Sequence, residues 1–334
     1  MKPMLWTFSL FAAAVLAQDV NRATNSLFDN SELKTFAVKS IMVEGEVENP
    51  GLVDLNQLPL RSIAVKELAQ ERGKQVFLGA FLFYGWSLSD VLNSKKVKKA
   101  AGNTFSPPID LYAVVENNKG EKTAVSWGEI YYTRDGSNIL ISKSVRAINP
   151  ANGKTKWPLP EEPRLICGND LLNVRFLSNP TKITVKSYRG IYSTEKPKNM
   201  YSPEIKILMA GNTAGIADIG SSVEKRRWSS VGYGHGAGFK EVATFTGFLL
   251  KDLIDNSIKV RGDDLSNTLA VVSAKDGYHS VFSASEIMNR NDNQDILLID
   301  KKDAEDGRYT LFVGGFFVDR NVKAVEKIEL VSIK

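Results

Sequence analysis

The sequence predicts two tandem copies of one domain, each built from short strands and short capped helices. The main observation is an internal repeat, because Ala113 to Ile130 returns as Ala270 to Ile287 without a gap. Seven positions are identical: Ala113/Ala270, Val114/Val271, Val115/Val272, Gly120/Gly277, Ser126/Ser283, Glu129/Glu286 and Ile130/Ile287. Chance at ordinary composition gives about one identity. The period is far longer than a solenoid repeat, so duplication of a whole domain explains it better.

Length and composition agree with two domains. The chain has 334 residues, of which 43% are hydrophobic, enough for two cores. Its net charge of +5 is mild and spread out, which argues against nucleic acid as a partner. The single cysteine, Cys167, excludes an internal disulfide, and with two histidines we expect no metal site. Cys167 ends an apolar run, which favours a buried thiol over a catalytic nucleophile.

The N-terminus has the pattern of a secretory signal peptide over residues 1–17. Lys2 supplies the charge, Leu5 to Leu16 is the apolar core, and Ala17 ends a small-residue cleavage site. The apolar run is too short for a transmembrane helix, and no later run is long enough. We therefore expect a soluble protein exported to the periplasm or the cell exterior, without a transmembrane segment. Residues 18–35 are polar and are predicted to form a flexible leader.

The rest of the chain divides at a polar stretch. We expect a first domain over residues 36–187, a linker over 188–203 and a second domain over 204–334. The first domain opens with strand-like alternation at Ile41, Val43 and Val47. The stretch from 79 to 92 predicts a strand, a break at Gly85 and a short helix. Thr246 to Ile254 repeats this shape.

Both copies carry a helix-start signal of the type Ser-x-x-Glu. Ser126 precedes Glu129 by three residues, and Ser283 precedes Glu286 by the same spacing. In a capping box the serine hydroxyl and the glutamate carboxylate satisfy the first free backbone N–H groups of a helix. We therefore expect the two glutamates to be helix caps, with a catalytic carboxylate as the alternative.

These blocks together resemble a known family. The sequence runs from Gly45, Val47 and Pro50, through G-[WF]-x-L-x-D-[VL]-[LI] at residues 85–92 and 247–254, to Asp276-Gly277-Tyr278 before Ser-x-x-Glu. This order is similar to that of the oxidoreductase molybdopterin-binding domain, which has the sulfite-oxidase fold. The resemblance implies an α+β fold with a mixed sheet and short helices, present as two tandem copies. It also implies molybdopterin as the cofactor.

Enzymes of that family ligate molybdenum through a cysteine that precedes the G-[WF]-x-L block. The corresponding segments of this chain, residues 60–84 and 220–246, contain no cysteine. Cys167 lies after the block in the first copy and does not match the ligand.

One segment has the composition of a ligand-binding loop, residues 225–240, KRRWSSVGYGHGAGFK. Alternating glycines allow backbone N–H groups to converge on an anion, and arginine can hold a phosphate with two parallel hydrogen bonds. The predicted cofactor or ligand contacts are Arg226, Arg227, Gly232, Gly234, His235, Gly236 and Gly238. The alternative is a glycine-rich surface loop without a ligand.

Two functional hypotheses follow. The first is an exported binding or accessory protein on a duplicated scaffold that lacks the metal-ligating cysteine; its partner would be a small anionic or pterin-like ligand. The second is a molybdopterin-dependent oxidoreductase with a cofactor site that uses no cysteine. The sequence does not decide whether the protein is an enzyme, and it names no protein partner.

Overall fold

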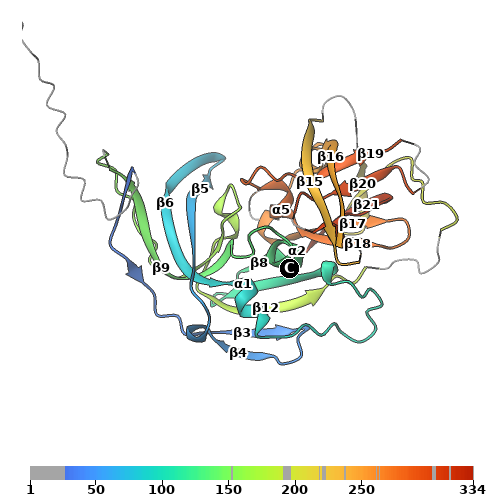
Figure 1. The fold of residues 1–334 in the computed structure, drawn as a ribbon. Helices are drawn as coiled ribbons and strands as arrows, with labels where there is room; N and C mark the ends of the chain where they lie inside the picture. Colours follow the sequence, from blue (N-terminus) through green and yellow to red (C-terminus); the bar gives the residue numbers. More distant parts are fainter. Residues whose placement is uncertain are drawn as a thin grey trace, which may run out of the picture.

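A computed structural model describes residues 27–333 except 152, 191–196, 218, 220–222, 237, 261, 263, 303–305 and 316. The expected signal peptide and the leader up to residue 26 lie outside these residues. In Figure 1 the chain forms two halves side by side, the first coloured blue to green and the second yellow to red. We call residues 27–190 the first half and residues 197–333 the second half.

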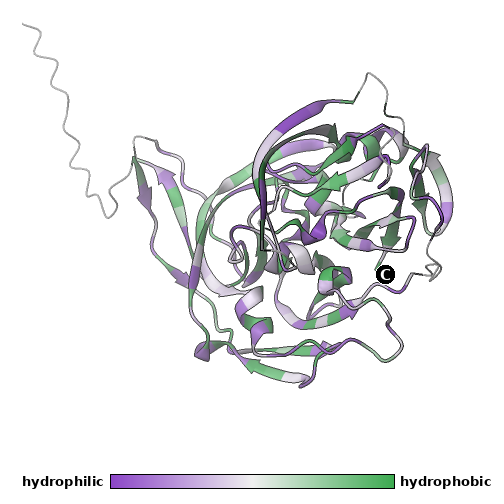
Figure 2. Cartoon of the chain, turned by 45° about the vertical axis from the view of Figure 1, so that its right-hand side comes forward, coloured by the Kyte–Doolittle hydropathy of each residue, from purple (hydrophilic) through white to green (hydrophobic). Residues whose placement is uncertain are grey.

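The predicted α+β class is wrong, because the fold is mostly β. Strands hold 49% of the residues and helices 14%, and the strands form four sheets. The capping signals do start helices, but α2 and α5 are only five residues long. The sequence interpretation missed long hairpins such as β5 (Arg61–Glu71) with β6 (Lys74–Ser87). Figure 2 shows hydrophilic and hydrophobic residues interleaved along the strands, as in sheets with one solvated face.

The first half contains two sheets. The strands besides β5 and β6 are β1 (Phe28–Asn30), β2 (Lys34–Thr35), β3 (Ser40–Gly45), β4 (Gly51–Asp54), β7 (Leu111–Asn117), β8 (Lys122–Ser126), β9 (Ile139–Pro150), β10 (Arg164–Cys167), β11 (Leu177–Ser178) and β12 (Pro180–Ser187). The helices are α1 (Leu88–Asn93), α2 (Trp127–Tyr131) and the 3₁₀ turns η1 (Leu55–Gln57), η2 (Pro108–Asp110) and η3 (Asn173–Arg175). One sheet has the order β4-β3-β12-β7-β8, and the other β11-β10-β9-β6-β5, with β1 and β2 on β9.

The second half repeats this plan. Its strands are β13 (Lys206–Met209), β14 (Asn212–Ile216), β15 (Lys225–Gly234), β16 (Gly238–Leu249), β17 (Thr268–Ala274), β18 (His279–Ser283), β19 (Leu297–Asp300), β20 (Tyr309–Phe312) and β21 (Val325–Ser332). Its helices are α3 (Leu250–Ser257), α4 (Asp264–Asn267), α5 (Ala284–Met288) and the 3₁₀ turn η4 (Val318–Arg320). The sheets have the orders β14-β13-β21-β17-β18 and β15-β16-β19-β20.

The two halves therefore share one topology. The five-stranded sheets have equivalent strand orders, and each contains one parallel pair, β3 with β12 and β13 with β21. The long hairpins also correspond, because Arg61 pairs with Gly85 and Arg226 with Gly247. Even the bulge is repeated, after Glu67 in β5 and after Gly232 in β15. These registers allow each residue of one half to be matched to a residue of the other.

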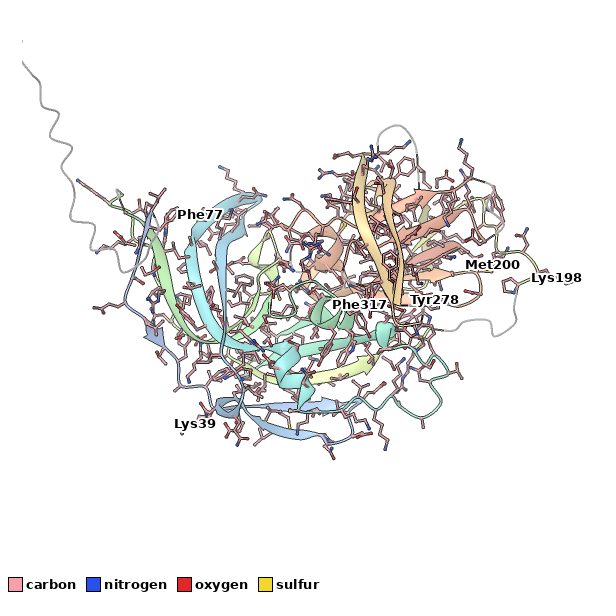
Figure 3. The ribbon with its side chains drawn as sticks, viewed as in Figure 1. Lys39, Phe77, Lys198, Met200, Tyr278 and Phe317 are labelled. Carbon is pink, nitrogen blue, oxygen red and sulfur yellow. The ribbon has the colours of Figure 1, made fainter. Side chains whose placement is uncertain are left out.

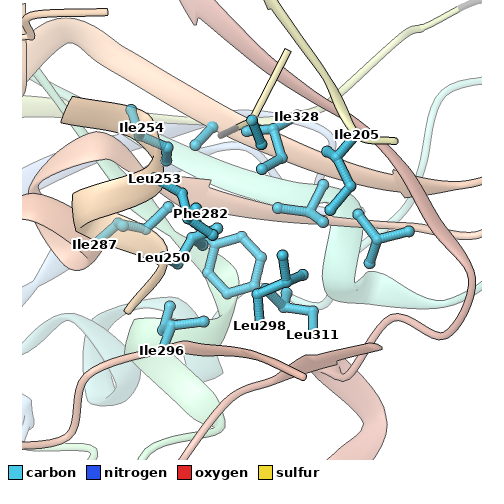
Figure 4. Packing of buried hydrophobic residues seen from close by; sticks show 14 of the residues in the cluster. Ile205, Leu250, Leu253, Ile254, Phe282, Ile287, Ile296, Leu298, Leu311 and Ile328 are labelled. Atoms are coloured by element: carbon cyan, nitrogen blue, oxygen red, sulfur yellow. The ribbon is translucent and has the colours of Figure 1, made fainter. Parts of the chain in front are cut away.

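Each half has its own hydrophobic core. In the second half, Leu250, Leu253 and Ile254 from α3 pack with Phe282 of β18 and Ile328 of β21 (Figure 4). The corresponding cluster of the first half holds Trp86, Leu88 and Val91 with strands of both sheets. Burial of these side chains supplies the main stabilisation, at about 25 cal/mol per Å² of apolar surface.

The halves meet through the last strands of the five-stranded sheets, β8 and β18. Ala124 of β8 belongs to one buried cluster with Leu269, Val271 and Val281 of the second half. Thr123 Oγ1 donates a hydrogen bond to the Ser266 carbonyl at 3.1 Å. The interface is thus a packed, hydrogen-bonded core between the two copies.

The connecting segments are described in part. Residues 191–196 of the expected linker lie outside the described residues. The described end of the expected leader forms β1 and β2, which pair with β9. No helix in the described part of the chain is long and apolar enough to cross a membrane.

A glycine marks the same close approach in both halves, which predicts a graded effect of substitution. A Cβ at Gly85 would lie 2.1 Å from the Ile141 carbonyl oxygen, and one at Gly247 would lie 2.8 Å from that of Leu298. Overpacking typically costs about 1–3 kcal/mol. We expect Gly85→Ala to lower the free energy of unfolding more than Gly247→Ala, measured by urea denaturation. Gly236→Ala, which meets no atom within 4 Å, is the control; equal effects at all three positions would contradict the packing argument.

Candidate functional site

The glycine-rich segment forms a β-hairpin rather than a loop that cradles an anion. Gly232 and Gly234 are buried within β15, Gly236 lies in the turn, and Gly238 begins β16. The register pairs Gly232 with Glu241 and Gly234 with Gly238. A Cβ at Gly234 would lie 3.0 Å from Val318 Cγ2. Gly234 therefore allows the hairpin to approach η4 closely, which is a packing role.

The two predicted arginines lie away from these glycines. Arg226 is six residues before Gly232 on one strand, a separation of about 20 Å at about 3.3 Å per residue. Arg226 Nε donates to Glu224 at 2.9 Å, and its guanidinium lies 3.7 Å from Asp295. Its counterpart Arg61 makes a similar pair with Asp90 at 2.9 Å. Both arginines are thus engaged by carboxylates of their own half, although the partners are not equivalent, and this indicates a structural role for Arg226.

Arg227 and His235, two further predicted contacts, are exposed. Arg227 lies on β15 and faces solvent. The His235 side chain is 85% exposed, and its Nδ1 contacts the Asp319 carboxylate. Asp319 also accepts from the His235 backbone N–H at 3.2 Å. The seven predicted residues are thus spread along one hairpin and do not converge on one point.

A charged centre that the sequence interpretation missed lies between the halves. Arg175 at the end of η3 and Arg320 at the end of η4 are both about 2% exposed. Arg175 donates to both oxygens of Glu129 at 2.9 Å. Arg320 binds Glu286 in the same bidentate way, at 2.6 and 3.0 Å. Each arginine therefore neutralises the capping glutamate of its own half.

Each arginine also reaches the serine cap of the other half. Arg175 Nη1 donates to Ser283 Oγ at 2.9 Å, and Arg320 Nη2 lies 3.3 Å from Ser126 Oγ. Ser126 Oγ in turn donates to Glu286 Oε2 at 2.6 Å. We call this set of two arginines, two glutamates and two serines the arginine centre. Its reciprocal contacts connect the two copies through buried, charge-assisted hydrogen bonds.

The prediction that Glu129 is a helix cap is confirmed. Ser126 and Glu129 form a complete capping box at the start of α2, and both glutamates lie in the first turn of a helix. At α5, the Ser283 hydroxyl accepts from the Glu286 N–H at 3.0 Å. The Glu286 carboxylate points to Arg320 and Ser126 instead of its own N-cap backbone. Ser-x-x-Glu therefore predicted the caps but not their ion pairs.

Two further residues, Asp170 and Ser285, extend the arginine centre on one side only, because their counterparts in the other half are glycines. Asp170 accepts from Arg175 Nε at 2.8 Å and from Ser285 Oγ at 3.1 Å. Five residues before Arg320 stands Gly315, and 157 residues before Ser285 stands Gly128. A Cβ at Gly128 would lie 2.0 Å from Arg320 Nε, so this arginine fills the space that the missing side chain leaves. Arg320 Nε is buried without a hydrogen-bond partner in the described structure.

Burial and the neighbouring charges together set the direction of the pKa shifts in the centre. Three carboxylates (Glu129, Glu286 and Asp170) face two guanidiniums (Arg175 and Arg320), which leaves one surplus negative charge. Burial raises the pKa of Glu129 above its ordinary value, and repulsion from Glu286 adds to this effect against the attraction of Arg175. Burial also disfavours the charged form of Glu286, but the Arg320 guanidinium outweighs burial and lowers its pKa.

The residues present do not fit the molybdopterin that the family resemblance implies. Cys167 is 1% exposed within the core of the first half, where burial raises the pKa of its thiol. The predicted glycine-rich contacts belong to the paired strands of a hairpin. No cluster of three or more metal-ligating side chains is present among the described residues. No step through this cofactor is therefore derived.

A groove runs beside the hairpin at the junction of the two halves. It has a volume of about 1110 Å³, against about 640 and 610 Å³ for two pockets elsewhere. Its walls include Trp228 and Tyr233 of β15, Phe312 at the end of β20 and Phe317 beyond that strand. Arg134 of the first half lies on its border. Figure 3 shows Phe317 beside the hairpin, where its ring centroid lies 6.1 Å from that of Tyr233. We call it the β15 groove.

The aromatic side chains of the groove walls are specific to the second half. The shared registers match Trp228 to Ile63, and the shared bulge matches Tyr233 to Leu68. Phe312 ends β20 as Cys167 ends β10, and Phe317 precedes η4 as Leu172 precedes η3. Four wall positions are therefore aromatic where the first half has Ile63, Leu68, Cys167 and Leu172.

Small residues open the groove on one side. Gly314 and Gly315 line it, where the first half has Asn169 and Asp170. A Cβ at Gly314 would meet no atom within 4 Å, so this position borders open space. The groove thus combines aromatic side chains with two glycines and with polar residues such as Asp292, Asn293 and Gln294. No single sequence motif marks it, although the doublet Gly314-Gly315 followed by Phe316-Phe317 was a signal that the sequence interpretation left unused.

Comparison with known proteins adds no identity to this geometry. Neither the models of known protein families nor the curated proteins that were searched match this chain.

The opposite pKa shifts predict different costs for two equivalent substitutions. Glu286→Gln leaves Arg320 without its carboxylate, and breaking a buried ion pair typically costs about 3–5 kcal/mol. Glu129→Gln removes the surplus charge and leaves Asp170 on Arg175. We expect Glu286→Gln to lower the free energy of unfolding by more than Glu129→Gln, measured by urea denaturation at neutral pH. Similar costs would contradict the charge imbalance.

The same shifts predict a pH dependence. The folded pKa of Glu286 lies below the ordinary value of 4.5, so its contribution is present above pH 4.5 and is lost as the pH falls through the folded pKa. The raised pKa of Glu129 has the opposite effect: its contribution to the free energy of unfolding is present below pH 4.5 and is lost as the pH rises through the folded pKa of Glu129. Below pH 4.5, we expect unfolding free energy to fall less steeply in Glu286→Gln than in the unmodified protein. An unchanged slope would show that Glu286 does not titrate there.

Proposed function

We propose that this chain is an exported binding or accessory protein that holds a small organic ligand in the β15 groove without transforming it. The observation that carries the proposal is the composition of the groove. Its walls are largely aromatic and aliphatic, and its volume of about 1110 Å³ suits a small-molecule site. The N-terminal signal-peptide pattern supports export.

The titratable groups in the groove favour binding over catalysis. The described residues that line it include no histidine, cysteine, lysine or glutamate. The carboxylate there, Asp292, is held by Arg290 through hydrogen bonds of 2.9 and 2.5 Å. Burial disfavours the charged form of Asp292, but this arginine keeps the pKa below its ordinary value, which disfavours a role as general base near neutral pH.

The arginine centre supports the same conclusion. Its carboxylates are more than nine-tenths buried and are bound by arginine or by helix N-termini. Such an arrangement fixes the two halves against each other, and therefore fixes the groove at their junction. A rigid groove reduces the ordering cost of binding.

Blocking the groove should strongly weaken binding of a neutral ring compound. The probe is N-phenylnaphthylamine, whose fluorescence rises in apolar surroundings. We expect Gly314→Phe to weaken probe binding at least tenfold, because the new ring would enter the groove where no atom lies within 4 Å of the Cβ. The matched control is Gly236→Phe, which also places a ring in open space but in the hairpin turn.

Two results would count against this function. If the unmodified protein does not bind the probe, the groove is not a site for apolar rings. If Gly314→Phe and Gly236→Phe bind it equally well, the probe binds elsewhere. Thermal unfolding of both variants checks that the fold is intact.

A further inference from the structure

We infer that the ligand of the β15 groove is a planar aromatic anion, and that Arg134 of the first half binds its anionic group. This inference rests on the proposed binding function and specifies the ligand class. Two observations carry it: the aromatic walls and the state of Arg134.

The walls favour a flat ring. Trp228, Tyr233, Phe312 and Phe317 replace three aliphatic side chains and a cysteine of the other half. Phe312 and Trp228 also pack in a small core cluster with Phe245, whereas Tyr233 is 46% exposed, so core packing does not account for the whole aromatic set. Aromatic faces bind planar rings by offset stacking or by edge-to-face contact, which adds to the burial of apolar surface. The difference between the halves therefore points to a ring-shaped ligand.

Arg134 supplies the charge complementarity. It follows α2 by three residues, and it lines the groove from the first half. Within the described structure Arg134 makes no hydrogen bond or ion pair. Arg290, in contrast, binds Asp292, a residue that lines the groove. A guanidinium with free N–H groups beside an apolar wall suits a carboxylate, sulfonate or phosphate.

Asp292 is the carboxylate that lines the same groove. The negative charge of Asp292 does not oppose an anion strongly, because Arg290 binds both of its oxygens.

A ligand in this position would contact both halves at once. Its ring would pack against residues of the second half and its anionic group against Arg134 of the first half. Because the two halves are fixed by the arginine centre, Arg134 is held at a constant place relative to the aromatic walls.

The test uses two probes with the same ring system. Anilinonaphthalene sulfonate carries a negative charge, and N-phenylnaphthylamine is neutral; the full chain is titrated with each and fluorescence is recorded. We expect Arg134→Gln to weaken binding of the sulfonate about tenfold, which corresponds to a loss of about 1.4 kcal/mol. Binding of the neutral probe should remain unchanged.

Arg227→Gln is the matched control. Arg227 is an exposed arginine on the wall strand β15 but does not line the groove. We expect this variant to bind both probes like the unmodified protein. An effect of Arg227→Gln on the sulfonate without an effect of Arg134→Gln would place anion recognition on the outer face of the hairpin and overturn the inference.

The remaining outcomes separate this inference from the proposed function. If Arg134→Gln binds both probes normally, while Gly314→Phe blocks the neutral one, the groove is a binding site without anion recognition. If Arg134→Gln weakens both probes equally, Arg134 shapes the groove rather than binding charge. If Gly314→Phe does not weaken sulfonate binding, the anion is not in the groove. Each of these results would overturn the inference.

Discussion

The reciprocal contacts of Arg175 and Arg320 hold the two halves in one arrangement. Each guanidinium is buried, so its charge must be met by carboxylates of the same half, and each also donates to or lies beside a serine of the other half. Separating the halves would break these contacts and bring buried charges into a new environment. Buried ion pairs contribute less to net stability than to geometry, because desolvation offsets much of the Coulomb attraction. The centre therefore acts mainly to specify how the copies meet.

The β15 groove follows from divergence between two copies of one scaffold. The first half fills the corresponding region with Asn169 and Asp170 and ties Asp170 to its arginine. The second half has Gly314 and Gly315 at these positions, and aromatic side chains around them. The two copies thus differ at this place: one has Asn169 and Asp170 beside aliphatic side chains and a cysteine, and the other has two glycines beside aromatic side chains. A binding function requires only this difference, since fold alone does not determine function.

Local signals in the sequence predicted local structure well. Ser126 and Glu129 predicted a helix cap because both partners of a capping box lie within one turn. The burial of Cys167 was also predicted correctly from its apolar neighbours. The repeat around Ala113 predicted two helices whose glutamates occupy the same first-turn position.

Long-range features could not be obtained in this way. Arg175 lies 46 residues from Glu129, and nothing near either residue indicates the other. The α+β class failed because short capped helices were counted as full elements, while β5 was not recognised. Most polar residues of β5 are exposed, but Glu67 is buried among its apolar positions, which obscures the alternation expected of a strand. The alternating glycines of β15 suggested a phosphate cradle, although alternate positions on a strand lie on one face, and here that face packs on η4.

The serine contacts across the centre have a consequence for the ancestry of the chain. In a protein with a single copy of this domain, the same arginine could reach the serine only of a second molecule. Two such molecules would exchange identical contacts about a two-fold axis, as in an isologous dimer. Fusion of the two subunits would then free each to change independently. The present difference between Asp170 and Gly315, and between Ser285 and Gly128, is one that a symmetric dimer of identical subunits could not have.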